Sequence, residues 1–116
     1  MTTTELQDFF EKEDFQVHLF EQDNEQCAEV EKWTDGGVDM IFQLIPFEAK
    51  EFIERVENFD VDEEIDFYRG WRDYKKDFTV SESLKDFTNF HKDLKKTAKK
   101  LEKLMNKTPQ NLTKII

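Results

Sequence analysis

The order of apolar and polar positions at the start of the chain predicts a short helix. Thr4-Glu5-Leu6-Gln7 has the pattern of a capping box, which opens a helix that runs to about Lys12. The side chains expected to face inward are Leu6, Phe9 and Phe10.

Strict alternation then predicts two strands. In the segment 15–20, Phe15, Val17 and Leu19 alternate with polar residues, as in a half-buried strand. A turn at 23–25 leads into a second strand over 26–33. In this strand, Ala28 and Val30 lie on one face, and Glu29 and Glu31 lie on the other.

Thr34-Asp35-Gly36-Gly37 is the strongest hairpin signal in the chain, because Asp-Gly and Gly-Gly tolerate the positive φ angles of tight turns. It predicts a third strand over 38–45, which Pro46 ends. One face of this strand holds Val38, Met40, Phe42 and Leu44. The other face includes Ile41 and Ile45, so we expect it to be partly covered as well.

After Pro46 the apolar residues recur at the spacing of a helix. One helical face collects the apolar residues Ala49, Phe52, Ile53, Val56 and Phe59. The segment 60–74 has Ile65, Tyr68, Trp71 and Tyr74 at steps of three, which predicts a short, bent helix interrupted near Gly70.

Ser81 is expected to cap a last, longer helix, in which steps of three and four connect Leu84, Phe87, His91, Leu94, Ala98, Leu101 and Met105. Pro109 predicts the end of regular structure. The chain is therefore expected to form a single α+β domain over 1–108, followed by a tail over 109–116 that is free to be loose.

The fold class that follows is α+β, with an N-terminal helix, a three-stranded antiparallel β-meander and two to three C-terminal helices packed on the sheet. A chain of 116 residues suffices for one domain with one core. Twelve phenylalanines supply apolar bulk that disordered chains lack, although 38% of the residues are charged.

The charge is unevenly distributed. The formal net charge is −10, with 27 acidic and 17 basic residues. Residues 91–116 contain eight lysines and two acids, so they carry +6, and residues 1–90 carry −16. An acidic body repels nucleic acid and anionic lipid and favours basic partners. The lysine-rich end either folds back on this body or meets an anionic molecule.

No catalytic or cofactor signature emerges. Glu25 and Glu29 lie near the single cysteine, Cys27, which disfavours a thiolate, and His91 lies in an apolar stripe typical of a packed histidine. The glycine-rich phosphate loops are absent. We expect a protein that is not an enzyme and has no cofactor. A structural role for Cys27 and His91 is favoured over a catalytic pair of Cys27 with His18 or His91.

A metal site is also disfavoured. A calcium loop beginning at Asp60 would need glycine where Ile65 stands and glutamate where Trp71 stands. A weaker divalent site at Asp60, Asp62 and Asp66 stays open as an alternative. No signal peptide and no run of roughly 18 apolar residues is present, which favours a cytoplasmic protein without membrane contact.

The strongest functional feature is an excess of acidic residues between residues 48 and 66. This segment contains nine acids and only two basic residues, Lys50 and Arg55. Such an excess is unfavourable through self-repulsion, so solubility or function must compensate for it. The candidate partner-binding residues, which we name the acidic surface, are Glu48, Glu51, Glu54, Glu57, Asp60, Asp62, Glu63 and Glu64.

The order of elements and the acidic bias resemble those of small inhibitors of DNA-targeting nucleases encoded by phages and mobile elements, the anti-CRISPR and antirestriction proteins that act as DNA mimics. The segments 33–41 and 58–65 look like parts of uncharacterised small acidic proteins of gut bacteria and their mobile elements. These resemblances imply a fold and a kind of partner, and they assign no functional residue.

The leading hypothesis is a non-enzymatic binding protein that engages a basic protein surface, as a DNA mimic would engage a nuclease or another nucleic-acid-binding protein. An immunity or antitoxin-type protein bound to a basic toxin is an alternative with the same chemistry. A structural module that associates with itself through the apolar stripe at 84–105 is another. We expect no direct nucleic-acid contact and a monomer or weak homodimer.

Overall fold

The structure is a computed structural model that describes residues 1–69 and 79–115, with side chains for 1–67 and 79–106. Its elements in chain order are α1 (Thr3–Lys12), β1 (Gln16–Gln22), β2 (Glu25–Trp33), β3 (Asp39–Leu44), α2 (Ala49–Glu57), α3 (Val61–Arg69) and α4 (Val80–Ile115). The α+β fold class is therefore confirmed, with three helices after the sheet.

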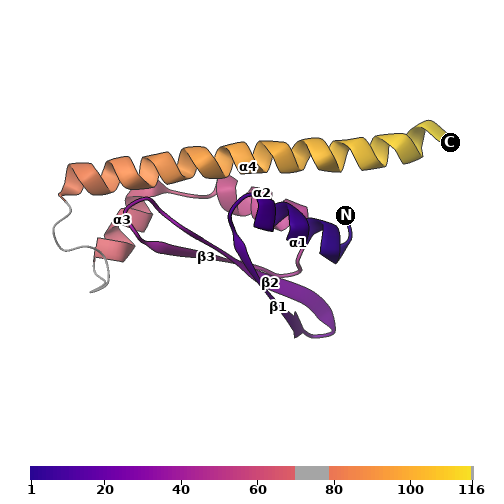
Figure 1. Ribbon diagram of the computed structural model, residues 1–116, viewed down its shortest axis with the longest axis horizontal. Coiled ribbons are helices and arrows are strands. Elements are labelled where there is room, and N and C mark those ends of the chain that lie inside the picture. The colour runs from indigo at the N-terminus through magenta and orange to yellow at the C-terminus, as the bar shows by residue number, and fades with distance from the viewer. Residues whose placement is uncertain (70–78, 116) are drawn as a thin grey trace.

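The strands form one antiparallel sheet in the order β1-β2-β3. Asp23 and Asn24, at the β1–β2 turn, both have positive φ angles, as a tight hairpin turn requires. Gly37, with φ 89°, serves the β2–β3 turn. Helices α1, α2 and α4 lie on one side of the sheet, and α4 runs along the length of the molecule (Figure 1).

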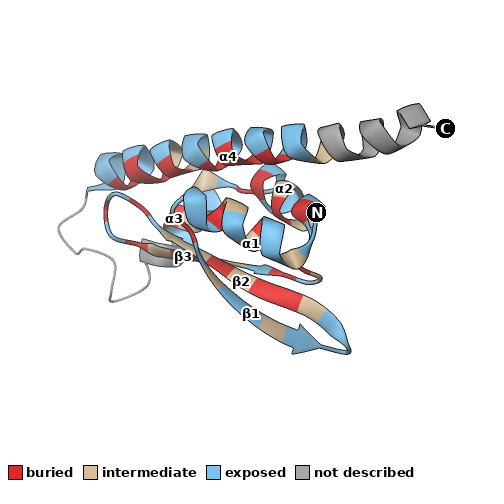
Figure 2. Cartoon of the chain, turned by 45° about the vertical axis from the view of Figure 1, so that its right-hand side comes forward, coloured by how far each residue is buried: buried red, intermediate tan, exposed pale blue. Residues whose placement is uncertain are grey.

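Phenylalanine rings connect the layers into one core. The ring of Phe10 on α1 lies 4.9 Å from that of Phe52 on α2, and Phe52 meets Phe42 of β3 at 6.4 Å. Phe59, after α2, continues the chain of rings to Phe90 of α4 at 6.2 Å. Edge-on ring contacts of this kind add stability beyond the area that they bury. Figure 2 shows the buried positions of α4 on the side that faces this core.

The predicted helix starts were wrong by two residues in both cases. Thr2 caps α1 in a capping box with Glu5, so the helix begins before Thr4. At α4, the hydroxyl of Thr79 accepts a hydrogen bond from the amide of Glu82, so Thr79 caps the helix in place of Ser81. In both places several threonines or serines stand near the start, and each can cap.

The far end of α4 also differs from expectation. The helix continues through Pro109 to Ile115, so Pro109 does not end the regular structure. A proline removes one hydrogen bond from a helix and is not an absolute stop. The looseness of 109–116 stays a prediction. The interruption near Gly70 lies outside the described residues, as do the side chains of Tyr68, Trp71 and Tyr74.

The apolar stripe of α4 packs within the monomer, with Phe87, Phe90, Leu94, Ala98 and Leu101 all buried. Leu84 was predicted in this stripe but is 45% exposed, because the buried side of this turn holds Ser83 and Asp86 instead. The part of the chain described here contains no helix long and apolar enough to span a membrane.

The sheet buries the face that meets the core more completely than the other face. Val38, Met40 and Leu44 are buried as predicted, and Phe42 packs against the same core. The other face is partly covered, as expected: Cys27 has no exposed surface and Glu29, Glu31 and Asp39 are half-buried, whereas Ile41 is 50% exposed and Ile45 38%. We name this more exposed side the open face. Its strand residues are those that share the side of Ile41 in the register: Gln16, His18, Phe20, Gln22, Glu25, Cys27, Glu29, Glu31, Trp33, Asp39 and Gln43.

Candidate functional site

Helix α2 presents the first half of the acidic surface. Ala49, Phe52 and Val56 anchor one side of the helix in the core. Glu54 and Glu57 therefore point to solvent, Glu51 is half-buried at the flank, and Glu48 occupies the exposed N-cap position. The spacing of three along a helix places such acids about 4.5 Å apart along its axis.

Asp60 has a structural role that the sequence did not single out. Its Oδ1 accepts hydrogen bonds from the amides of Asp62 at 3.0 Å and Glu63 at 3.2 Å. These are first-turn amides of α3, so Asp60 serves as the cap of that helix. Replacing Asp60 would change the helix as well as the charge.

Helix α3 presents the second half. Asp62 and Glu63 are exposed in its first turn, where negative charge is favourable to the helix dipole. Burial first, and then repulsion from Glu63 and Asp60, raise the pKa of Glu64 above its usual value. The neighbouring carboxylates thus contribute to the raised pKa of Glu64, after burial.

The two basic residues of the segment neutralise little of this charge. Lys50 pairs with Glu48 at 3.8 Å, and both side chains are exposed, so the pair is weak. Arg55 donates to the backbone carbonyl of Gln43 at 3.2 Å, which ties α2 to β3. In the described part of the chain, six members of the acidic surface have no hydrogen bond or ion pair through their side chains, and four of these six are exposed: Glu54, Glu57, Asp62 and Glu63.

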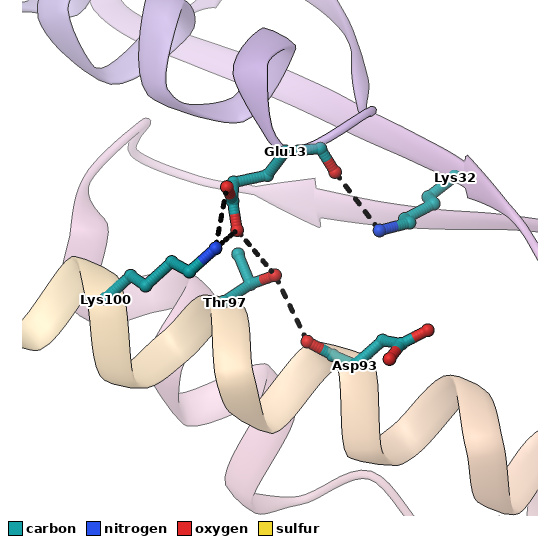
Figure 3. A network of polar contacts seen from close by, with 5 residues as sticks. All are labelled: Glu13, Lys32, Asp93, Thr97 and Lys100. Atoms are coloured by element: carbon teal, nitrogen blue, oxygen red, sulfur yellow. Dashed lines mark hydrogen bonds and ion pairs between the residues drawn. The ribbon is translucent and has the colours of Figure 1, made fainter.

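Lys100 of α4 is directed at Glu13 and not at the acidic surface. Figure 3 shows the Nζ of Lys100 against the carboxylate of Glu13, at 3.1 and 3.2 Å. Glu13 also accepts from the hydroxyl of Thr97 at 3.4 Å, and its backbone carbonyl accepts from Lys32 at 3.1 Å. One expected contact of the lysine-rich end with the acidic body is thus present, at the α1–β1 turn. Among described side chains, no ion pair connects the α4 lysines to the acidic surface.

The candidate catalytic residues differ in their surroundings. Cys27 is fully buried, and its Sγ donates to the carbonyl of Glu25. The ring of His91 lies 4.9 Å from that of Phe59. Burial first, and Lys95 second, lower the pKa of His91, which fits a packed neutral ring. His18 is exposed on β1, with its Nε2 at 3.7 Å from Glu31.

No cluster of three or more histidine, cysteine, aspartate or glutamate side chains within 1–67 and 79–106 is arranged to hold a metal ion. The open alternative at Asp60, Asp62 and Asp66 is therefore not supported by the geometry.

Sequence reasoning missed a second group of acids, on the open face. Burial, together with a hydrogen bond and repulsion from Glu31, raises the pKa of Asp39 to about 6, while His18 acts in the opposite direction. The two carboxyl groups come from different strands. Glu31 pairs with Ile41 and Trp33 pairs with Asp39, so only the strand register brings the acids together. A sequence signal did exist in the alternation of Glu29 and Glu31 along the face away from the core.

Comparison with known proteins identified no similar protein. No protein-family model matches the chain, and neither a curated protein nor a solved structure matches it. The class of protein is therefore defined by fold and surface alone: a small α+β domain whose most distinctive exposed feature is uncompensated negative charge.

Proposed function

We propose that this protein is a non-enzymatic binding protein whose acidic surface engages a basic surface of another protein. The observation that supports the proposal most is the set of four exposed carboxylates on α2 and α3 that have no partner among the described residues: Glu54, Glu57, Asp62 and Glu63. Holding like charges together on one surface costs free energy. A cationic partner would recover that cost.

The partner that fits best is a protein that itself binds nucleic acid. Acids three residues apart on a helix recur about every 4.5 Å along the axis. Each strand of duplex DNA carries a charge about every 3.4 Å. The two charge densities are comparable, so the acidic surface could occupy a groove built for DNA, as in a nuclease. A basic toxin presents the same chemistry, and release by DNA distinguishes the two.

The test is a pull-down from host lysate with three baits. One bait is the wild-type protein. The second, the surface variant, carries the charge reversals Glu54→Lys, Glu57→Lys, Asp62→Lys and Glu63→Lys, and leaves the capping Asp60 intact. The third is a control variant with the same change in net charge at exposed acids elsewhere: Asp8→Lys, Glu11→Lys, Glu21→Lys and Asp93→Lys. Circular dichroism first verifies that all three are folded.

We expect the wild type and the control variant to retain a basic protein at low salt and to release it at high salt, because such contacts are screened. The surface variant should retain none. Release by added duplex DNA would identify the partner as a nucleic-acid-binding protein. Equal retention by both variants, or the capture of no basic protein by the wild type, would contradict the proposal.

A further inference from the structure

Strand β1 forms one edge of the sheet, and its outer side carries backbone groups that another strand could bind. It pairs with β2 alone, and Figure 2 shows it at the outer edge of the sheet. Gln22 and Glu25 flank a two-residue turn, so they exchange hydrogen bonds, and bonded pairs then alternate with non-bonded pairs along the hairpin. By this alternation the amides and carbonyls of Val17, Leu19 and Glu21 point away from β2.

A hydrogen bond on the far side of β2 supports this assignment. Gln26 lies opposite Glu21, and its backbone carbonyl accepts from the amide of Phe47 at 2.8 Å. The backbone of Gln26 therefore faces away from β1, as a non-bonded pair requires. Among the described residues, no group outside the sheet forms a hydrogen bond with the backbone of Val17, Leu19 or Glu21.

Strand β1 also lacks the features that usually protect an edge strand. Native edges are blunted by lysine, proline, a bulge or a covering element. The segment Gln16–Gln22 contains no lysine, arginine or proline, and its 7 residues pair with β2 without a bulge. The opposite edge differs, because the carbonyl of Gln43 in β3 accepts from Arg55 of α2. β1 is therefore the edge at which a further strand can add to the sheet.

The sequence of β1 fits a second copy of itself. The antiparallel register that overlaps the whole strand gives the pairs Leu19–Leu19, Val17–Glu21 and His18–Phe20. In this register the outward amides of one copy meet the outward carbonyls of the other. Leu19 is 42% exposed, so the pairing also covers an apolar side chain.

The charge on β1 permits this pairing. Glu21 is the one acidic residue of the strand, and the register places the two Glu21 side chains about 13 Å apart along the strands. That separation exceeds the Debye length of about 8 Å at physiological salt, so their repulsion is largely screened. Like charges meet at the strand ends, where the same register brings Asp23 near Asp14 of the second copy.

We propose that β1 is a homodimerisation edge, at which two copies join their β1 strands antiparallel into one continuous sheet with Leu19 at the two-fold axis. Growth beyond two copies is disfavoured, because the other edge is blunted where Arg55 binds Gln43. The apolar stripe of α4 takes no part in the dimer, since it is buried within the monomer. The acidic surface lies on other elements, α2 and α3, so the dimer carries two copies of it.

The dimer and the proposed function respond to salt in opposite directions. Two molecules of net charge −10 repel each other, and salt screens this repulsion, so salt should strengthen the dimer. Salt should weaken the attraction between the acidic surface and a basic partner. The surface variant of α2 and α3 separates the two proposals further: it carries less negative charge, so it should dimerise at least as tightly as the wild type while retaining no basic protein.

Sedimentation equilibrium of the purified protein from low to high micromolar concentration measures the dimer. Leu19→Glu places two carboxylates opposite each other at the axis and should weaken the dimer by about tenfold or more. The matched control is Leu84→Glu, the same change at a leucine of similar exposure, 45%, and it should leave the dimer unchanged. Asp23→Asn suits the positive φ of the turn and removes a like charge, so it should strengthen the dimer. Circular dichroism verifies that the variants fold.

Amide hydrogen exchange, followed residue by residue by NMR, locates the interface. Raising the protein concentration should protect the outward amides of Val17, Leu19 and Glu21. The amides of His18 and Phe20 bond to β2, so they should be protected at every concentration. This alternating response is specific to the edge of a strand, because docking of a sheet face or a helix would leave the outward amides unpaired.

Three results would overturn the proposal. The first is a protein that stays monomeric at high concentration and high salt. The second is a dimer that Leu84→Glu dissociates and Leu19→Glu does not, which would assign the contact to α4. The third is protection of the Leu19 amide only when another protein is added, which would assign the edge to a strand of that partner.

Discussion

The carboxylate of Asp86 accepts a hydrogen bond from the hydroxyl of Thr34 at 2.8 Å and another from the amide of Gly36 at 2.9 Å. Asp86 lies in the second turn of α4, and the other two residues form the β2–β3 turn. Thr34 in turn accepts from the amide of Val38 at 3.0 Å. This buried connection holds the hairpin against the helix, and both acceptor oxygens of Asp86 are used.

Asp86→Ala should destabilise the protein by about 2–3 kcal/mol, because it leaves the Gly36 amide and the Thr34 hydroxyl buried without their acceptor. Asp86→Asn retains one acceptor oxygen and should cost less. Urea denaturation measures both. Asp93→Ala, at an exposed position of the same helix, is the control and should change stability by no more than about 0.5 kcal/mol. An Asp86→Ala effect as small as that of the control would refute the role assigned to this connection.

Phe52→Ala should cost about 3–5 kcal/mol in the free energy of unfolding, as truncation of a buried phenylalanine usually does. Phe52 has no exposed surface and contacts the rings of Phe10, Phe15 and Phe42. Leu84→Ala should change stability by only about 0.5 kcal/mol, because Leu84 is largely exposed despite its place in the apolar pattern. A large loss at Leu84 would contradict the boundary of the core drawn here.

Stability should fall as the pH rises through the range in which Asp39 ionises. Its pKa in the folded protein is about 6, whereas an aspartate in an unfolded chain has a pKa of about 3.9. The folded state therefore holds this proton more tightly between about pH 4 and pH 6, so ionisation favours unfolding over that window. The raised pKa of Glu64 acts in the same direction.

The matched variant is Asp39→Asn, which removes the titrating group and its repulsion with Glu31. It should be more stable than the wild type at pH 7, and the difference should shrink as the pH falls towards 4. Urea denaturation at several pH values measures this. Parallel stability curves for the two proteins would show that Asp39 does not titrate as described.

The sequence predicted the elements that have one buried face and one solvated face. In β3 the alternation of Met40, Phe42 and Leu44 identified the side that meets the core, because side chains of a strand alternate between faces. In α2 the spacing of Phe52 and Val56 did the same for a helix. Periodicity reports which side of an element is apolar, and in these two elements that side met the core.

The wrong predictions have a common physical cause. The hydrophobic pattern of one element does not show which other part of the chain packs against it. Leu84 is apolar, but the core does not cover it. The choice of Thr2 over Thr4 as cap depends on where the chain enters the fold. Likewise, the acidic surface was visible as composition, whereas the pairing of Glu31 with Asp39 depends on register between strands.

The measurement that tests the central claim most directly is an amide hydrogen-exchange footprint of the wild-type protein with the basic protein that it retains. We expect slower exchange on complex formation in α2 and the start of α3, over residues 48–64, and no change along the lysine-bearing face of α4. Protection confined to α4 or to the N-terminal helix, with residues 48–64 unaffected, would contradict the claim that the acidic surface is where the partner binds.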